Sequence, residues 1–147
     1  MIEPVRRRGL ELPAPVRAML LDEAARHAPA ECCGVLLGAA GAPLRIVDAI
    51  AVPNRSPAED DYLIDHTAVR RLELSARAAG RFVTGFYHSH PRGPAQPSGR
   101  DLEAAWPGYI YLVIGGAIGG APGELRAWRL LEDRQHFEEI PVMTAAS

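Results

Sequence analysis

The stretch RFVTGFYHSHPRGPAQPSGRD, residues 81–101, contains the pattern from which the fold and the candidate site can be predicted. Residues 81–90 are rich in β-branched and aromatic side chains, which is typical of a strand. Proline and glycine dominate residues 91–99 and predict a loop, and a short helix is expected over Gly99–Ala105. The predicted strand therefore ends on two histidines, immediately before a loop that leads into a helix.

The two histidines, His88 and His90, are separated by one residue. Side chains at positions i and i+2 of a strand point to the same face, about 6.5–7 Å apart at their Cα atoms. Two imidazoles in this arrangement can converge on one metal ion at Zn–N distances of about 2.0–2.1 Å. Ser89 should then face away from the ion. The alternative is that the pair is a surface accident at a strand end.

Asp101 follows His90 by eleven residues, and Ser98 stands three residues before it. A serine at a helix start with an acid three positions later is the pattern of a capping box, which is a purely structural explanation. The two explanations are compatible, because a cap would hold Asp101 beside the histidines. Two histidines and one carboxylate form a three-ligand set typical of catalytic zinc, with a fourth position left for water.

Glu31 is the candidate proton acceptor, because it opens an apolar run, ECCGVLLG over 31–38, that predicts a buried strand. The alternative is an ordinary polar strand end. The adjacent Cys32 and Cys33 should point to opposite faces, so a routine disulfide between them is not expected. We predict that both are buried free thiols. A cysteine nucleophile is disfavoured because it would leave Asp101 without a role.

The rest of the sequence has the patterns of further helices and strands. Apolar residues at helical spacing predict helices over Pro15–His27 and Thr67–Ala79. Further strands are expected over 44–53, 108–114, 124–131 and 136–142, with a polar loop over 54–61. This order predicts a single α/β domain of the α+β type over 1–147, with an ordered core over about 8–143.

Composition limits the function classes. The 147 residues are 48% hydrophobic with a net charge of −2, which fits one globular domain. No apolar run reaches the roughly 18 residues of a membrane span, and no hydrophobic segment follows the basic N-terminus, so we expect a cytoplasmic protein without a membrane partner. The 16 basic residues are all arginine and face 18 acids, which argues against nucleic-acid binding.

Glu31 in ECCGVLLG together with HSHPRGPAQPSGRD at 88–101 resembles the motif of the JAMM (MPN+) metalloprotease family. In order along the chain, that motif consists of a distant glutamate, then His-Ser/Thr-His, then seven intervening residues and a serine, and finally two residues and an aspartate. Every position of the motif matches this sequence. The order of predicted elements is also similar over nearly the whole chain. The resemblance implies a single MPN domain, with a central mixed, curved β-sheet flanked by helices in a cytidine-deaminase-like arrangement.

By this resemblance, His88, His90 and Asp101 would bind one Zn²⁺ per chain. Glu31 would accept the proton of a water activated by the metal and pass it to the leaving amine. Ser98 would donate a hydrogen bond to the developing oxyanion.

The resemblance also implies the substrate, a ubiquitin-like protein cut after its C-terminal diglycine at a peptide or isopeptide bond. Compact bacterial members of the family act on sulfur-carrier proteins of ubiquitin fold, including cysteine adducts. The strand 44–53 or the loop 54–65 could supply an edge that pairs with the diglycine tail. Exposed strand edges also make a homodimer plausible.

Three other functions share features with this sequence. A RadC-like protein has a similar histidine motif, although its helical N-terminal extension is not found here. A non-catalytic MPN scaffold module would dock partners only, but such modules typically lose the metal ligands that this chain keeps. Cleavage of cell-wall or phage-tail components would favour a second hydrolase domain, for which 147 residues leave no room.

Overall fold

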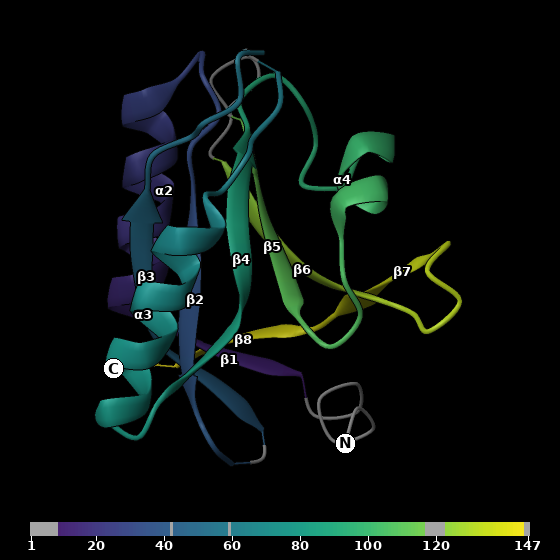
Figure 1. The fold of residues 1–147 in the computed structure, drawn as a ribbon. Coiled ribbons are helices and arrows are strands. Elements are labelled where there is room, and N and C mark those ends of the chain that lie inside the picture. The colour runs from purple at the N-terminus through teal and green to yellow at the C-terminus, as the bar shows by residue number, and fades with distance from the viewer. Residues whose placement is uncertain (1–8, 42, 59, 117–122, 146–147) are drawn as a thin grey trace.

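The computed structural model describes residues 9–41, 43–58, 60–116 and 123–145. The remaining residues of the predicted 1–147 domain lie outside this description. The described part consists of one eight-stranded mixed sheet and three helices (Figure 1). The elements are β1 (Leu10–Pro13), α2 (Ala14–His27), β2 (Cys33–Ala39), β3 (Leu44–Val52), α3 (His66–Ala78), β4 (Phe82–His90), α4 (Gly99–Ala104), β5 (Ile110–Gly115), β6 (Glu124–Leu130), β7 (Phe137–Ile140) and β8 (Val142–Ala145).

The sheet is strongly curved, as its strand order β7-β6-β5-β4-β2-β3-β1-β8 requires. The two edge strands, β7 and β8, are consecutive in the chain and are separated by Pro141 alone. In a flat sheet they would lie about 34 Å apart, seven spacings of about 4.8 Å, which one residue cannot span. The edges therefore meet at Pro141, whose carbonyl accepts a hydrogen bond from the Leu10 N–H at 2.8 Å. The predicted mixed, curved sheet is confirmed.

Strand β2 is buried on both faces, which explains why its sequence is apolar without alternation. Leu36 lies in the larger core cluster, against which Val16 and Ala24 of α2 pack. Its neighbours Val35 and Leu37 lie in a second cluster with side chains of α3. The two helices thus cover opposite faces of the sheet at β2.

Three features of the fold differ from the sequence prediction. Residues 136–142 were expected as one strand, but Pro141 separates β7 from β8 and the two pair with different neighbours. Strand β1 was not predicted, because its four residues gain their partners, β3 and β8, only through long-range pairing. Glu31, expected to open a strand, instead lies two residues before β2.

No helix in the described ranges is long and apolar enough to cross a bilayer. The cytoplasmic localisation and the homodimer stay predictions.

Candidate active site

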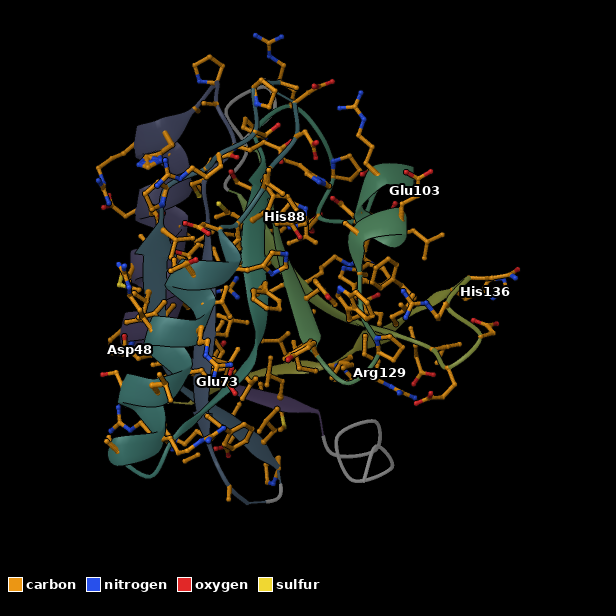
Figure 2. The ribbon with its side chains drawn as sticks, in the orientation of Figure 1. Asp48, Glu73, His88, Glu103, Arg129 and His136 are labelled. Carbon is orange, nitrogen blue, oxygen red and sulfur yellow. The ribbon has the colours of Figure 1, made fainter. Side chains whose placement is uncertain are left out.

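The C-terminal end of β4 presents the histidine pair. β4 is a central strand, with His88 opposite Cys33 of β2 and Val113 of β5. His88 is 1% exposed and lies in the interior of the molecule, whereas His136 lies at its outer edge (Figure 2). Ser89 points to the other face, as expected, and its Oγ accepts a hydrogen bond from the Cys32 N–H at 2.9 Å.

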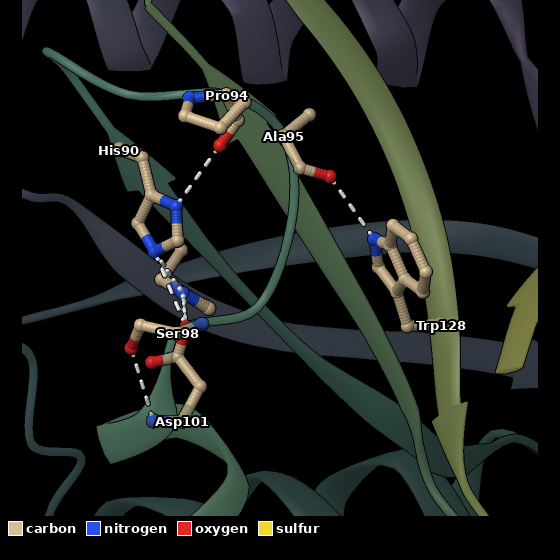
Figure 3. A network of polar contacts seen from close by, with 7 residues as sticks. His90, Pro94, Ala95, Ser98, Asp101 and Trp128 are labelled. Carbon is tan, nitrogen blue, oxygen red and sulfur yellow. Dashed lines mark hydrogen bonds and ion pairs between the residues drawn. The ribbon is translucent and has the colours of Figure 1, made fainter. Parts of the chain in front are cut away.

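The start of α4 presents the carboxylate. Ser98 Oγ accepts a hydrogen bond from the Asp101 N–H at 3.2 Å, and Asp101 Oδ2 accepts one from the Ser98 N–H at 2.8 Å (Figure 3). This reciprocal pair is the predicted capping box. It holds the side chain of Asp101, which is 7% exposed, against the histidines.

Three potential ligand atoms converge at this point. Asp101 Oδ2 lies 3.1 Å from His88 Nε2 and 3.2 Å from His90 Nε2, and the two Nε2 atoms are 3.0 Å apart. Ligand atoms around a tetrahedral zinc ion with bonds of about 2.0–2.2 Å are separated by about 3.3–3.6 Å. The observed triangle is close to that size.

The second ring nitrogen of His90 has a hydrogen-bond partner of its own. His90 Nδ1 lies 3.1 Å from the carbonyl oxygen of Pro94. Because a carbonyl only accepts, Nδ1 is the donor, and Nε2 of the neutral ring then presents a lone pair. Nε2 faces the Asp101 carboxylate, which also only accepts, so the contact is favourable when a cation lies between the two atoms, either a metal ion or a second ring proton. The residues present therefore fit a divalent metal ion.

Glu31 approaches the same point from the segment before β2. It has a carboxylate oxygen grouped with ring nitrogens of His88 and His90 within 4.8 Å. The direct contacts to the histidines nevertheless belong to Asp101, and no hydrogen bond to the Glu31 carboxylate is found among the described residues. Burial raises the pKa of Glu31 to about 7, above the usual value of a glutamate.

A cavity of about 470 Å³ gives access to these groups. Glu31, His90, Ser98 and Asp101 all line it, and Asp60 extends the acidic wall. The cavity thus brings four of the five predicted site residues to one open surface, with His88 buried directly behind them.

Two residues of the loop between β3 and α3 complete the surroundings and were missed from the sequence. Tyr62 stacks on the ring of His88, with centroids 4.2 Å apart. Asn54 Nδ2 donates to the carbonyl oxygens of Glu31 and Asp61, at 3.2 and 2.9 Å. The Asn54 side chain also caps the N–H of Ser56, and this local turn is the one signal that the sequence offered.

The two cysteines are buried free thiols, as predicted. Burial raises the pKa of Cys32 to about 11 and that of Cys33 to about 12. Neither thiol is among the groups that line the cavity. Their place away from the cavity lining and their raised pKa values both argue against a cysteine nucleophile.

We expect neither thiol to react with an alkylating reagent in the folded protein at about pH 8, because a buried thiol with a raised pKa forms little thiolate. Both should react after unfolding in guanidinium chloride, as counted by the mass increase of the intact chain. Fast modification of Cys32 or Cys33 before unfolding would contradict their buried placement.

Comparisons with known proteins add independent information. A family model described as prokaryotic homologs of the JAB domain matches residues 13–131. A desampylase from Haloferax volcanii is 39% identical over 111 residues, which cover 71% of this chain and 78% of that protein. A probable TtuB-protein conjugate cleaving protease from Thermus thermophilus is 33% identical over 101 residues, covering 65% of this chain and 66% of the relative.

A crystal structure of a JAB1/MPN domain protein from Archaeoglobus fulgidus has the same fold. It superposes with a TM-score of 0.61 at 16% identity, covering 93% of this chain and 98% of the other. At this identity the likeness concerns the fold alone.

Proposed function

This chain belongs to the family of prokaryotic homologs of the JAB domain and is a peptide or isopeptide hydrolase, and we propose that it uses zinc to cleave after the C-terminal diglycine of a ubiquitin-like protein. The observation that carries this proposal is the convergence of His88 Nε2, His90 Nε2 and Asp101 Oδ2 within 3.2 Å of one another. They converge at a cavity that Glu31 and Ser98 also line.

In this proposal His88, His90 and Asp101 hold the zinc ion. When bound, zinc supplies Lewis-acid chemistry, lowering the pKa of water and polarising the scissile carbonyl. The capping box keeps Asp101 in place without help from the ion, because Ser98 donates to its carboxylate in the protein itself. The site is thereby preorganised by the helix start.

Glu31 is the proposed general base and general acid. Its carboxylate takes a proton from the attacking water and delivers it to the leaving amine. The position supports this role, since Glu31 lines the cavity but leaves the direct contacts with the histidines to Asp101. Its raised pKa reduces the free-energy cost of moving the proton in either direction.

Ser98 is the proposed hydrogen-bond donor to the oxyanion. Its Oγ accepts from the Asp101 N–H, which uses a lone pair and leaves the hydroxyl hydrogen available for a substrate. Its exposed position at the cavity wall makes that hydrogen accessible.

Ser98→Ala is expected to lower kcat by about 100-fold, the lower end of the range for an oxyanion donor, because zinc remains the principal Lewis acid. Loss of the helix cap should also cost about 1 kcal/mol of unfolding free energy. Steady-state kinetics and thermal unfolding separate the two effects. Ser98→Asp, which restores a cap but no donor, should recover stability without activity; recovery of both would contradict the assigned role.

The substrate class follows from the relatives, whose names refer to cleavage of ubiquitin-like conjugates. A sulfur-carrier protein with a diglycine tail is the form that we propose here. Glycine has no side chain to clash with the wall beside Glu31 and Asp60, so a diglycine can lie close to the ligands. The scaffold-module alternative loses support because such a module is not a hydrolase. The RadC-like alternative loses support because the matched relatives are named as conjugate-cleaving enzymes.

The test is to incubate the zinc-loaded protein with a ubiquitin-fold carrier that has one residue beyond its diglycine, and to follow the carrier by mass. We expect loss of that residue, and no loss after chelation. The matched control is the same carrier with Ala-Ala in place of Gly-Gly, which should stay intact. Inactivity toward every carrier encoded in the source organism would overturn the proposed function.

A further inference from the structure

The proline-rich loop over 91–97 is packed directly onto the backbone at the end of β5. The Gly93 N–H donates to the His90 carbonyl at 3.1 Å, and the Gly116 N–H donates to the Gly93 carbonyl at 3.2 Å. A Cβ atom on Gly115 would lie 2.9 Å from the backbone nitrogen of Ala95, and one on Gly116 would collide with the Pro91 carbonyl. The loop therefore lies this close because β5 ends in glycine.

Trp128 of β6 holds the same loop from the side. Its indole N–H donates to the carbonyl oxygen of Ala95 at 3.0 Å (Figure 3). The guanidinium of Arg126 lies over the Trp128 ring, 5.1 Å from its centroid, and is fixed by two hydrogen bonds to Glu139 at 2.8 and 2.6 Å. The direction of the indole N–H is thus set by a tethered ring.

The residue next to Ala95 is the one that orients His90. The Pro94 carbonyl accepts from His90 Nδ1, while His90 Nε2 faces the carboxylate of Asp101. Figure 3 shows the contact of Trp128 with Ala95 and the contacts that lead from Pro94 through His90 to Asp101; the peptide bond between Pro94 and Ala95 joins the two sets. For His88, by contrast, Nδ1 has no hydrogen-bond partner in the part of the chain that the structure describes.

We infer that Trp128 is a positioning residue of the metal centre: by holding the Ala95 carbonyl it fixes the Pro94 carbonyl, which selects the Nδ1–H tautomer of His90 and leaves Nε2 free for the ion. A partner on the second ring nitrogen fixes the tautomer and direction of a histidine ligand. This inference rests on the proposed zinc site, but the orientation of the His90 ring is present without an ion.

Trp128→Phe is the decisive variant, because it keeps an aromatic ring beneath Arg126 and removes the N–H donor. We expect the zinc affinity, measured by competition with a chromophoric chelator, to fall about tenfold. Loss of a residue that hydrogen-bonds a metal ligand typically lowers metal affinity by about 10–100-fold, and the lower value is expected because Trp128 acts through the loop. In the metal-free protein, long-range ¹H–¹⁵N NMR should show His90 Nδ1 protonated in the wild type. In the variant, a fraction of the rings should have lost the Nδ1 proton.

Trp106→Phe is the matched control. Trp106 is the other tryptophan of the chain, is 58% exposed and also lies under an arginine, Arg134, at 4.8 Å. This variant should bind zinc as the wild type does.

If Trp128→Phe proves too unstable to assay, Trp128→Gln and Trp128→Leu form a second pair. Only the glutamine variant retains an N–H donor, and it should bind zinc more tightly than the leucine variant.

Failure of the proposed function and failure of the inference about Trp128 give different results. If the wild type binds no zinc, the proposed function fails, and the inference is then decided by the protonation of His90 Nδ1 in the metal-free proteins. If the wild type binds zinc while Trp128→Phe keeps both the wild-type affinity and a fully protonated His90 Nδ1, Trp128 is not a positioning residue. Loss of affinity without a change in Nδ1 protonation would also refute the relay through Pro94.

Discussion

Glu31→Gln is expected to lower kcat for the diglycine substrate by about 10⁴-fold, the upper end of the range for general acid–base catalysis. The effect should be this large because one carboxylate carries the proton in both steps, from the attacking water and to the leaving amine. Glutamine has nearly the same shape but cannot accept that proton. Zinc content should stay at one ion per chain, because Glu31 is not among the proposed ligands.

The measurement combines single-turnover kinetics with metal analysis of the same sample. Glu132→Gln is the matched control, since Glu132 is exposed on the hairpin between β6 and β7 and should leave both quantities unchanged. Turnover above about a tenth of the wild-type rate in Glu31→Gln would falsify the role of Glu31 as the base. Loss of zinc in this variant would instead make Glu31 a ligand.

His90→Ala is expected to abolish stoichiometric zinc binding. Loss of a partner behind a ligand costs about 10–100-fold in affinity, so loss of a ligand itself should exceed about 100-fold. His90 suits this test better than His88, because its side chain is 14% exposed and its removal leaves a smaller defect in the core than removal of the fully buried ring. Activity should fall together with the bound metal.

Metal analysis after dialysis gives the stoichiometry. Thermal unfolding with and without a chelator gives a second readout, because a ligand that binds only the folded state raises its stability. Chelation should lower the melting temperature of the wild type and leave that of His90→Ala unchanged. His136→Ala, an exposed histidine paired with Asp133, should behave as the wild type. One zinc ion per chain in His90→Ala would remove His90 from the ligand set.

The parts of the site that sequence alone predicts are those separated by a few residues. The same-face placement of His88 and His90 follows from the strand period, and the capping box of Ser98 and Asp101 follows from helix-start geometry. Both are confirmed because the forces that produce them act within one strand or one helical turn. The catalytic roles of these residues stay predictions until the variants are measured.

Elements that depend on distant partners were harder to foresee. β1 has only four residues, and its hydrogen bonds go to β3 and β8, far along the chain. Trp128 lies 33 residues from Ala95, and nothing in the local pattern indicates that its indole N–H holds the loop. Tyr62 likewise reaches His88 only because the sheet order brings its loop across the end of β4.

By itself, the sequence determined which residues could do the chemistry, because residue type and local spacing decide what a strand end and a helix start can present. The tertiary structure alone decided that Glu31 lies within reach of His88 and His90, although 57 residues separate Glu31 from the first of them. It also placed the Pro94 carbonyl beside His90 Nδ1. The physical reason is that side-chain periodicity is local, whereas strand order and register are settled by burial of the whole sheet against α2 and α3.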